Sequence, residues 1–204
     1  MITKKNPDLF NFISFIFNPE NVIPLLLIIL AFKSFSGASL YGWIFMIVVF
    51  NYLFNYIWLY YLSFLGVEVD KPLEKGSVKK DRLLALIPQI LVLGLEMVIS
   101  DLYGQQQPFH AGIVLFLIGG ILFSLVTYYW KISAHAATTA SLFTALTVII
   151  SFWYLFTFLL VPIIYVSRKK LYRHTDYQLI MGNLLGIIVT LVILDWYGLV
   201  IAKV

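Results

Sequence analysis

Cysteine is absent from this sequence, and charged residues are scarce. Without cysteine the chain forms no disulfide and offers no thiolate to a metal ion. Charged residues make up 12% of the 204 positions, whereas 61% are hydrophobic. Soluble domains usually carry about 25% charged residues, and a water-soluble fold could not bury so large an apolar fraction. The composition therefore indicates an integral membrane protein.

Apolar runs long enough to cross a bilayer recur along the whole chain. About 20 helical residues span the hydrocarbon core of roughly 30 Å. A β-barrel would need strands of alternating hydrophobicity, which the sequence does not show, and an open sheet would leave backbone groups unpaired in lipid. We therefore predict an all-α integral membrane protein, in which residues 1–204 form a single membrane domain of six to seven transmembrane helices, some of them short.

Turn residues between the apolar runs predict where these helices lie. The stretch 8–17 is apolar but short and ends at an Asn-Pro-Glu sequence, so residues 1–20 are expected to form an interfacial N-terminal segment or a re-entrant start. Full spans are expected at 22–35, 41–65, 83–100, 109–130 and 178–202.

The uncharged stretch 136–166 could form one long span or a hairpin of two short helices. Three consecutive aromatic residues, Phe152, Trp153 and Tyr154, lie at its centre. Such clusters favour the membrane–water boundary over the hydrocarbon midplane. We therefore predict a hairpin, which completes a count of seven helices.

Lysine and arginine are distributed unevenly between the two ends of this bundle. When the predicted spans are counted, all of the 14 lysines and arginines except Lys33 and Lys203 fall on the side of the N-terminus. Cytoplasmic loops carry an excess of these residues. We therefore expect the N-terminus and the basic loops to face the cytoplasm.

Three groups of polar residues on that side exceed what topology requires. They lie in the loops 66–82, 131–135 and 167–178, which are the candidate active-site loops. The groups are Lys75, six residues, Arg82; Ile132-Ser133-Ala134-His135; and Ser167-Arg168, five residues, His174, three residues, Gln178.

These groups suit a phosphate better than a metal ion. Two imidazoles beside fixed guanidinium groups, with no cluster of acidic ligands, coordinate a metal poorly. Arginine matches phosphate oxygens with two parallel hydrogen bonds, lysine adds a point charge, and a serine at a helix start adds a hydroxyl beside free backbone amides. Two histidines on either side of the phosphorus could act as nucleophile and general acid.

The three groups resemble the signature motifs of the type 2 phosphatidic-acid phosphatase superfamily, and specifically its short bacterial membrane branch. That family's motifs read Lys, six residues, Arg-Pro; then Pro-Ser-Gly-His; then Ser-Arg, five residues, His, three residues, Asp. The resemblance runs from about residue 70 to 190 and is closest over 130–135 and 174–186.

The resemblance implies a metal-independent lipid phosphatase of the bacterial inner membrane that needs no cofactor. Its substrate would be a lipid phosphate such as phosphatidate, a phosphatidylglycerol phosphate or a polyprenyl phosphate, with membrane lipids and no nucleic acid as partners. His174 would attack phosphorus and become a phosphohistidine, while His135 would protonate the leaving alkoxide. The phosphoryl oxygens would be held by Lys75, Arg82 and Arg168, with Ser133 assisting.

The sequence departs from the family pattern at several motif positions. The most consequential is Gln178, which stands where the family has aspartate. Its carbonyl, four residues after His174 on the same helical face, could still accept a hydrogen bond from the ring, but it adds no charge. Lys79, three residues before Arg82, could replace Lys75 as the phosphate lysine. The other departures are Leu83, Ile132 and Ala134 in place of proline, proline and glycine.

Two other classes of function stay open. A non-catalytic protein that binds or transports lipid phosphates would keep the phosphate site, and Gln178 favours that alternative. An intramembrane prenyltransferase is suggested by the sequence Asp70-Lys71-Pro72-Leu73, but such enzymes hold magnesium with paired aspartate clusters, which this sequence lacks.

Overall fold

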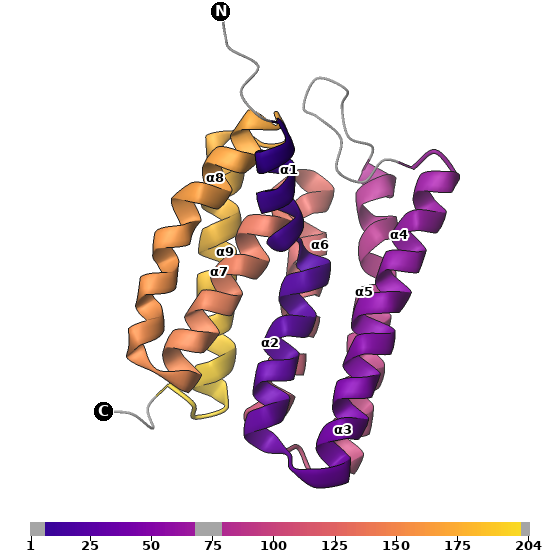
Figure 1. Cartoon of the computed structure of the whole chain (residues 1–204), viewed down its shortest axis with the longest axis vertical. Coiled ribbons are helices and arrows are strands. Elements are labelled where there is room, and N and C mark those ends of the chain that lie inside the picture. The colour runs from indigo at the N-terminus through magenta and orange to yellow at the C-terminus, as the bar shows by residue number, and fades with distance from the viewer. Residues whose placement is uncertain (1–6, 68–78, 201–204) are drawn as a thin grey trace, which may run out of the picture.

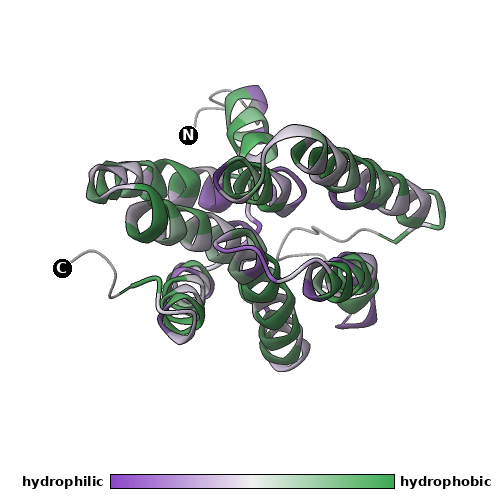
Figure 2. Cartoon of the chain, turned by 90° about the horizontal axis from the view of Figure 1, so that it is seen from below, coloured by the Kyte–Doolittle hydropathy of each residue, from purple (hydrophilic) through white to green (hydrophobic). Residues whose placement is uncertain are grey.

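The computed structural model describes residues 7–67 and 79–200, and every regular element in these ranges is a helix. Six of the helices are long and apolar enough to cross a membrane, and the shorter apolar helix Ala134–Ile150 packs among them. Hydrophobic residues dominate the ribbons, and hydrophilic segments are short (Figure 2). The predicted all-α membrane bundle is confirmed.

The helix bounds extend most of the predicted spans and break some of them. Where the sequence predicted a span at 22–35, one long apolar element covers Asp8–Ser34. It is not helical at Phe17 and Asn18, and a second helix begins at Pro19. The elements are α1 (Pro7–Ile16), α2 (Pro19–Ser34), α3 (Gly37–Met46), η1 (Ile47–Phe54), α4 (Asn55–Phe64), α5 (Lys79–Leu102), α6 (Phe109–Tyr129), α7 (Ala134–Ala145), η3 (Leu146–Ile150), η4 (Phe152–Leu160), α8 (Val161–Lys170) and α9 (Asp176–Trp196).

The hairpin predicted for residues 136–166 is confirmed. One arm, α7 with η3, ends at Ile150, and the other, η4 with α8, begins at Phe152. Ser151 between them has an extended backbone, with φ −167° and ψ 145°, and its hydroxyl caps the second arm. The aromatic side chains that follow are exposed, as expected at a membrane boundary.

The hairpin brings the predicted active-site segments to one end of the bundle. The first turns of α5, α7 and α9 and the last turn of α8 all lie at the upper end of the molecule in Figure 1, beside α1. The junctions of α2 with α3, of α5 with α6 and of η3 with η4 lie at the opposite end. Residues more than 90 positions apart in the sequence, such as Arg82 and His174, can therefore share one site.

Two glycines hold α9 against α7. A Cβ at Gly182 would lie 2.6 Å from the carbonyl oxygen of Ser133, and a Cβ at Gly186 would lie 2.2 Å from that of Ala137. Only glycine therefore allows the two backbones to approach so closely, as is common between membrane helices. This contact fixes the start of α7, which carries His135, against the start of α9.

A buried polar cluster connects α5 to the second span. Asn51 donates a hydrogen bond to Glu96 and accepts one from Gln89. Asn51 lies in the π-helical segment η1, where the Asn55 side chain donates to the carbonyls of Phe50 and Asn51. The Asn55 side-chain amide thus gives a hydrogen bond to two carbonyls in a segment where the backbone follows the π-helical hydrogen-bond pattern.

Candidate active site

The second polar group forms the start of α7. Ser133 is the N-cap of this helix, and its hydroxyl accepts a hydrogen bond from the Ala136 N–H at 3.3 Å. The prediction of a serine at a helix start is therefore confirmed, but its hydroxyl is fully buried and serves the helix itself. His135 lies in the first turn of α7 and belongs to a helix, where the sequence predicted a loop over 131–135.

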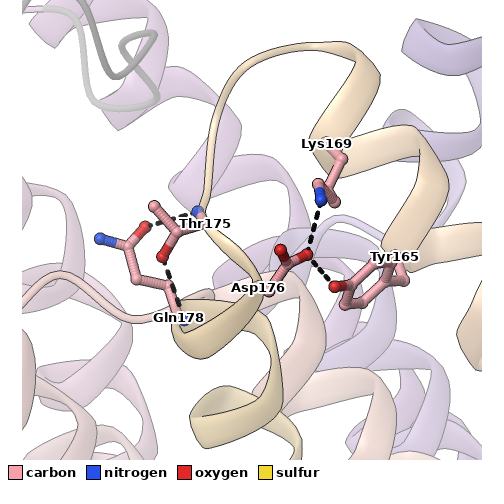
Figure 3. A network of polar contacts seen from close by, with 5 residues as sticks. All are labelled: Tyr165, Lys169, Thr175, Asp176 and Gln178. Atoms are coloured by element: carbon pink, nitrogen blue, oxygen red, sulfur yellow. Dashed lines mark hydrogen bonds and ion pairs between the residues drawn. The ribbon is translucent and has the colours of Figure 1, made fainter.

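The third group spans the end of α8 and the start of α9. Ser167 and Arg168 belong to the last turn of α8, so the connecting loop is only 171–175, shorter than the predicted 167–178. His174 directly precedes Thr175, the N-cap of α9. Thr175 and Gln178 form a capping box: the threonine hydroxyl accepts from the Gln178 N–H, and the Gln178 carbonyl accepts from the Thr175 N–H at 3.1 Å (Figure 3).

Asp176 points away from the glutamine. Its carboxylate accepts a hydrogen bond from the Tyr165 hydroxyl and pairs with the Lys169 ammonium at 2.7 Å (Figure 3). These contacts tie the start of α9 to α8 on the outer side of the loop. Asp176 therefore steadies the loop that carries His174 and is directed away from the side on which Gln178 lies.

The capping box gives Gln178 a structural role beside the orienting role that the sequence suggested. Gln178→Leu removes the side-chain carbonyl, and if that carbonyl also orients His174, activity should fall about 5- to 150-fold, in line with a lost buried hydrogen bond. Gln178→Asp keeps an acceptor and adds a charge that favours the imidazolium, so its activity should hold or rise. Phosphate release and thermal stability should be measured together, since a lost cap alone costs about 1 kcal/mol. If a well-folded Gln178→Leu protein matched the parent rate, Gln178 would only cap α9 and would not orient His174.

A polar cavity of about 340 Å³ joins the three groups at the upper end of the bundle. One predicted residue from each group lines it: Arg82 from α5, His135 from α7 and His174 from the α8–α9 loop. The fold thus brings one residue from each of three distant segments into the lining of one cavity. The other polar residues that line the cavity are Asn11, Ser14, Asn18, Glu20, Thr127, Lys131 and Arg173.

Arg168 lies behind the cavity wall, beside His135. Its side chain is fully buried, and Nη1 is 3.5 Å from Nε2 of His135. The same Nη1 donates a hydrogen bond of 2.6 Å to the hydroxyl of Ser14 in α1. The last turn of α8 thus positions the Arg168 guanidinium next to the His135 ring.

Of the two candidate lysines, Lys79 lies within the described residues, and it does not line the cavity. Lys79 lies on the first turn of α5, with its ammonium 5.0 Å from the centre of the Tyr128 ring, in a separate surface hollow. The Lys79 side chain thus leaves the helix toward α6, and its role as the phosphate lysine stays a prediction. Lys75 lies outside the described residues, as does most of the predicted loop 66–82.

Seven polar residues of the cavity lining were not recognised as site residues in the sequence, among them Lys131, Arg173, Ser14 and Glu20. Lys131 directly precedes the second group, and Arg173 lies inside the third group, next to His174. The Lys131 ammonium donates a hydrogen bond to the Arg173 carbonyl at 3.1 Å. Both were counted only as topology signals, although their position beside motif residues could have indicated them. Ser14 and Glu20 carry no such signal, because only the packing of α1 and α2 brings them to the site.

The charge of the cavity suits an anion with several oxygens. Three cationic side chains, Arg82, Lys131 and Arg173, line it together with the two histidines, and Glu20 is the one acidic side chain in the lining. Among the residues that the structure describes, no three histidine, aspartate or glutamate side chains group closely enough to hold a metal ion. Arginine and lysine around imidazoles favour a phosphoryl group.

An apolar slot of about 80 Å³ adjoins the polar cavity. The two hollows share Pro19, Glu20, Ala85, Leu86, Phe123 and Ala134 in their walls. From there the slot passes inward between α5, α6 and α9, along Leu93, Phe116 and Val189. A ligand with a charged head and an apolar chain would fit the two together.

Comparisons with known proteins found no match: no family model, no curated protein and no solved structure is similar to this chain at a significant level. The interpretation of the site therefore rests on its residues and their geometry.

Proposed function

We propose that this protein is a metal-independent lipid phosphatase that releases phosphate from a phosphomonoester or diphosphate lipid through a phosphohistidine intermediate. The observation that carries the proposal is the single cavity lined by Arg82, His135 and His174, which come from three separate segments. The resemblance of these segments to the motifs of the type 2 phosphatidic-acid phosphatase superfamily supports the same function.

The proposed reaction divides the work between the two histidines. A ring nitrogen of His174 attacks phosphorus, the bond from phosphorus to the lipid oxygen breaks, and His135 gives a proton to that oxygen. Water then attacks the phosphohistidine, His135 takes a proton from the water, and inorganic phosphate leaves with His174 restored. Arg82 and Arg168 stabilise the charge on the phosphoryl oxygens, which is usually the largest contribution to catalysis.

The apolar slot supports a lipid as the substrate. It opens from the polar cavity and continues into the bundle, so a phosphate held by the cations would direct its chain between the helices. A soluble phosphate ester would leave this apolar surface without a partner. Phosphatidate, a phosphatidylglycerol phosphate and a polyprenyl phosphate all combine the required head and chain.

A phosphate-release assay on the purified protein in detergent tests the proposal. We expect release from at least one of these three lipids, and we expect the rate to persist when a chelator removes divalent cations. Binding of the lipid without release would favour the alternative of a non-catalytic lipid-phosphate carrier. Transfer that stops in chelator and yields a prenylated product would favour the prenyltransferase alternative, whose Asp70 lies outside the described residues.

We also propose that the cavity faces the cytoplasm, in a bacterial inner membrane. Because the chain has no cysteine, single cysteines at Ser77, Lys170 and Gln106 can be labelled without a background. An impermeant thiol reagent should reach Ser77→Cys and Lys170→Cys from the cytoplasmic side and Gln106→Cys from the other side. Opposite sidedness for Ser77 and Lys170 would contradict both the orientation and the shared site.

A further inference from the structure

Ser14 of helix α1 contacts two of the site residues, His135 and Arg168. The Ser14 hydroxyl accepts a hydrogen bond of 2.6 Å from Nη1 of Arg168 and lies 3.3 Å from Nε2 of His135. The same Nε2 is 3.1 Å from the backbone carbonyl oxygen of Ser14. A carbonyl oxygen can only accept, so this contact is a hydrogen bond when Nε2 of His135 carries a hydrogen, which then points toward α1.

The proposed reaction needs the same two groups for the substrate. Arg168 is to hold a phosphoryl oxygen, and His135 is to give its proton to the leaving oxygen. A guanidinium nitrogen and an imidazole nitrogen within 3.3 Å of one oxygen form the environment that a phosphoryl oxygen requires. In the structure that oxygen belongs to Ser14.

We propose that α1 is a cover over the catalytic site and that Ser14 occupies the position of a phosphoryl oxygen until substrate displaces it. The inference rests on the proposed function and adds a regulatory step to it. With Ser14 in place, the His135 proton is directed to a backbone carbonyl and away from any leaving group. Catalysis therefore requires α1 to move from His135 and Arg168.

The attachments of α1 suit such a movement. The helix ends at Ile16, and the chain is not helical at Phe17 and Asn18 before α2 begins at Pro19, which provides a hinge. On its inner side the Ser167 hydroxyl of α8 donates a hydrogen bond of 2.7 Å to the Phe10 carbonyl.

The outer face of α1 is apolar and more than half exposed at Leu9 and Phe12. An outer face of this kind can enter the lipid interface. Movement of α1 would therefore keep its apolar side chains in lipid while it uncovers the site.

A disulfide between α1 and α8 tests the cover directly. Phe10→Cys with Ser167→Cys joins positions that already meet through a hydrogen bond, and the parent chain contributes no other cysteine. After oxidation the cross-linked protein should release phosphate at least about tenfold more slowly, and a reductant should restore the rate. The two single variants, with and without oxidant, are the matched controls. If the cross-linked protein released phosphate as fast as the same protein without the disulfide, the proposal that α1 covers the site would be overturned.

A second readout does not depend on activity. Diethyl pyrocarbonate should modify His135 in the reduced double variant and much more slowly in the oxidised one, as mapped by mass spectrometry. If neither the parent protein nor any variant released phosphate, the proposed function would fail. Protection of His135 in the oxidised protein would still support the cover. Equal modification in both states would overturn the cover whatever the activity.

Ser14→Ala provides a variant with little risk to folding. Without the hydroxyl that competes for Arg168, the KM for the lipid should fall about fivefold, the value of one modest hydrogen bond, with kcat unchanged. Phe12→Ala, on the outer face of α1, is the matched control and should leave KM at the parent value. A fall in kcat for Ser14→Ala would instead make Ser14 part of the active arrangement and overturn the cover.

Discussion

His174→Ala should abolish phosphate release from every lipid substrate. The substitution removes the nitrogen that is proposed to form the bond to phosphorus, and no other described nucleophile replaces it at that position of the cavity. Loss of a covalent nucleophile usually costs several orders of magnitude in kcat. The measurement is inorganic phosphate released per protein in detergent, with the background of uncatalysed hydrolysis subtracted.

His110→Gln is the matched control for this loss. His110 is a buried histidine at the start of α6, at the end of the bundle opposite the cavity, where its ring lies 3.1 Å from the Ser100 hydroxyl. It should keep the parent rate if it folds, as judged by thermal unfolding and gel filtration. Retained phosphate release in well-folded His174→Ala protein would overturn the proposed mechanism.

His135→Ala should separate substrates by their leaving group. With a lipid alkoxide, which needs a proton as it leaves, the rate should fall by about 10²–10⁴-fold, the usual contribution of a general acid. With an activated aryl phosphate, whose leaving group is stable without protonation, the loss should be much smaller. The ratio of the two losses, measured as kcat on each substrate, reports the general-acid role.

An equal loss on both substrates would contradict the assignment of His135 as general acid. It would indicate a role in holding the phosphoryl group, which its proximity to Arg168 also permits. His135→Gln is the useful companion, because glutamine can keep a hydrogen bond to the site but cannot transfer a proton.

The sequence predicted the parts of the fold that depend on local signals. The aromatic residues beginning at Phe152 placed the hairpin turn, and the structure turns at Ser151. Ser133 was recognised at a helix start and caps α7. The grouping of Arg82, His135 and His174 followed from counting spans, because an even number of crossings returns the chain to the same side.

What the sequence did not predict depends on tertiary packing. Ser14 lies 121 positions before His135, and no motif connects them; only the packing of α1 against α8 brings them together. The direction of the Lys79 side chain was equally hidden, since it is set by Tyr128 on a neighbouring helix. The capping role of Gln178 could have been predicted from the sequence, because Thr-x-x-Gln before an apolar run is a recognised capping pattern.

The most direct test of the central claim is to find the phosphorylated residue. Protein mixed with a lipid whose phosphate is isotopically labelled, quenched with base at short times and mapped by mass spectrometry, should carry the label on His174. The label should be absent from His174→Ala protein and should disappear from the parent as free phosphate accumulates. Phosphate release with no label on His174 at any quench time, or with the label on another side chain, would contradict the account.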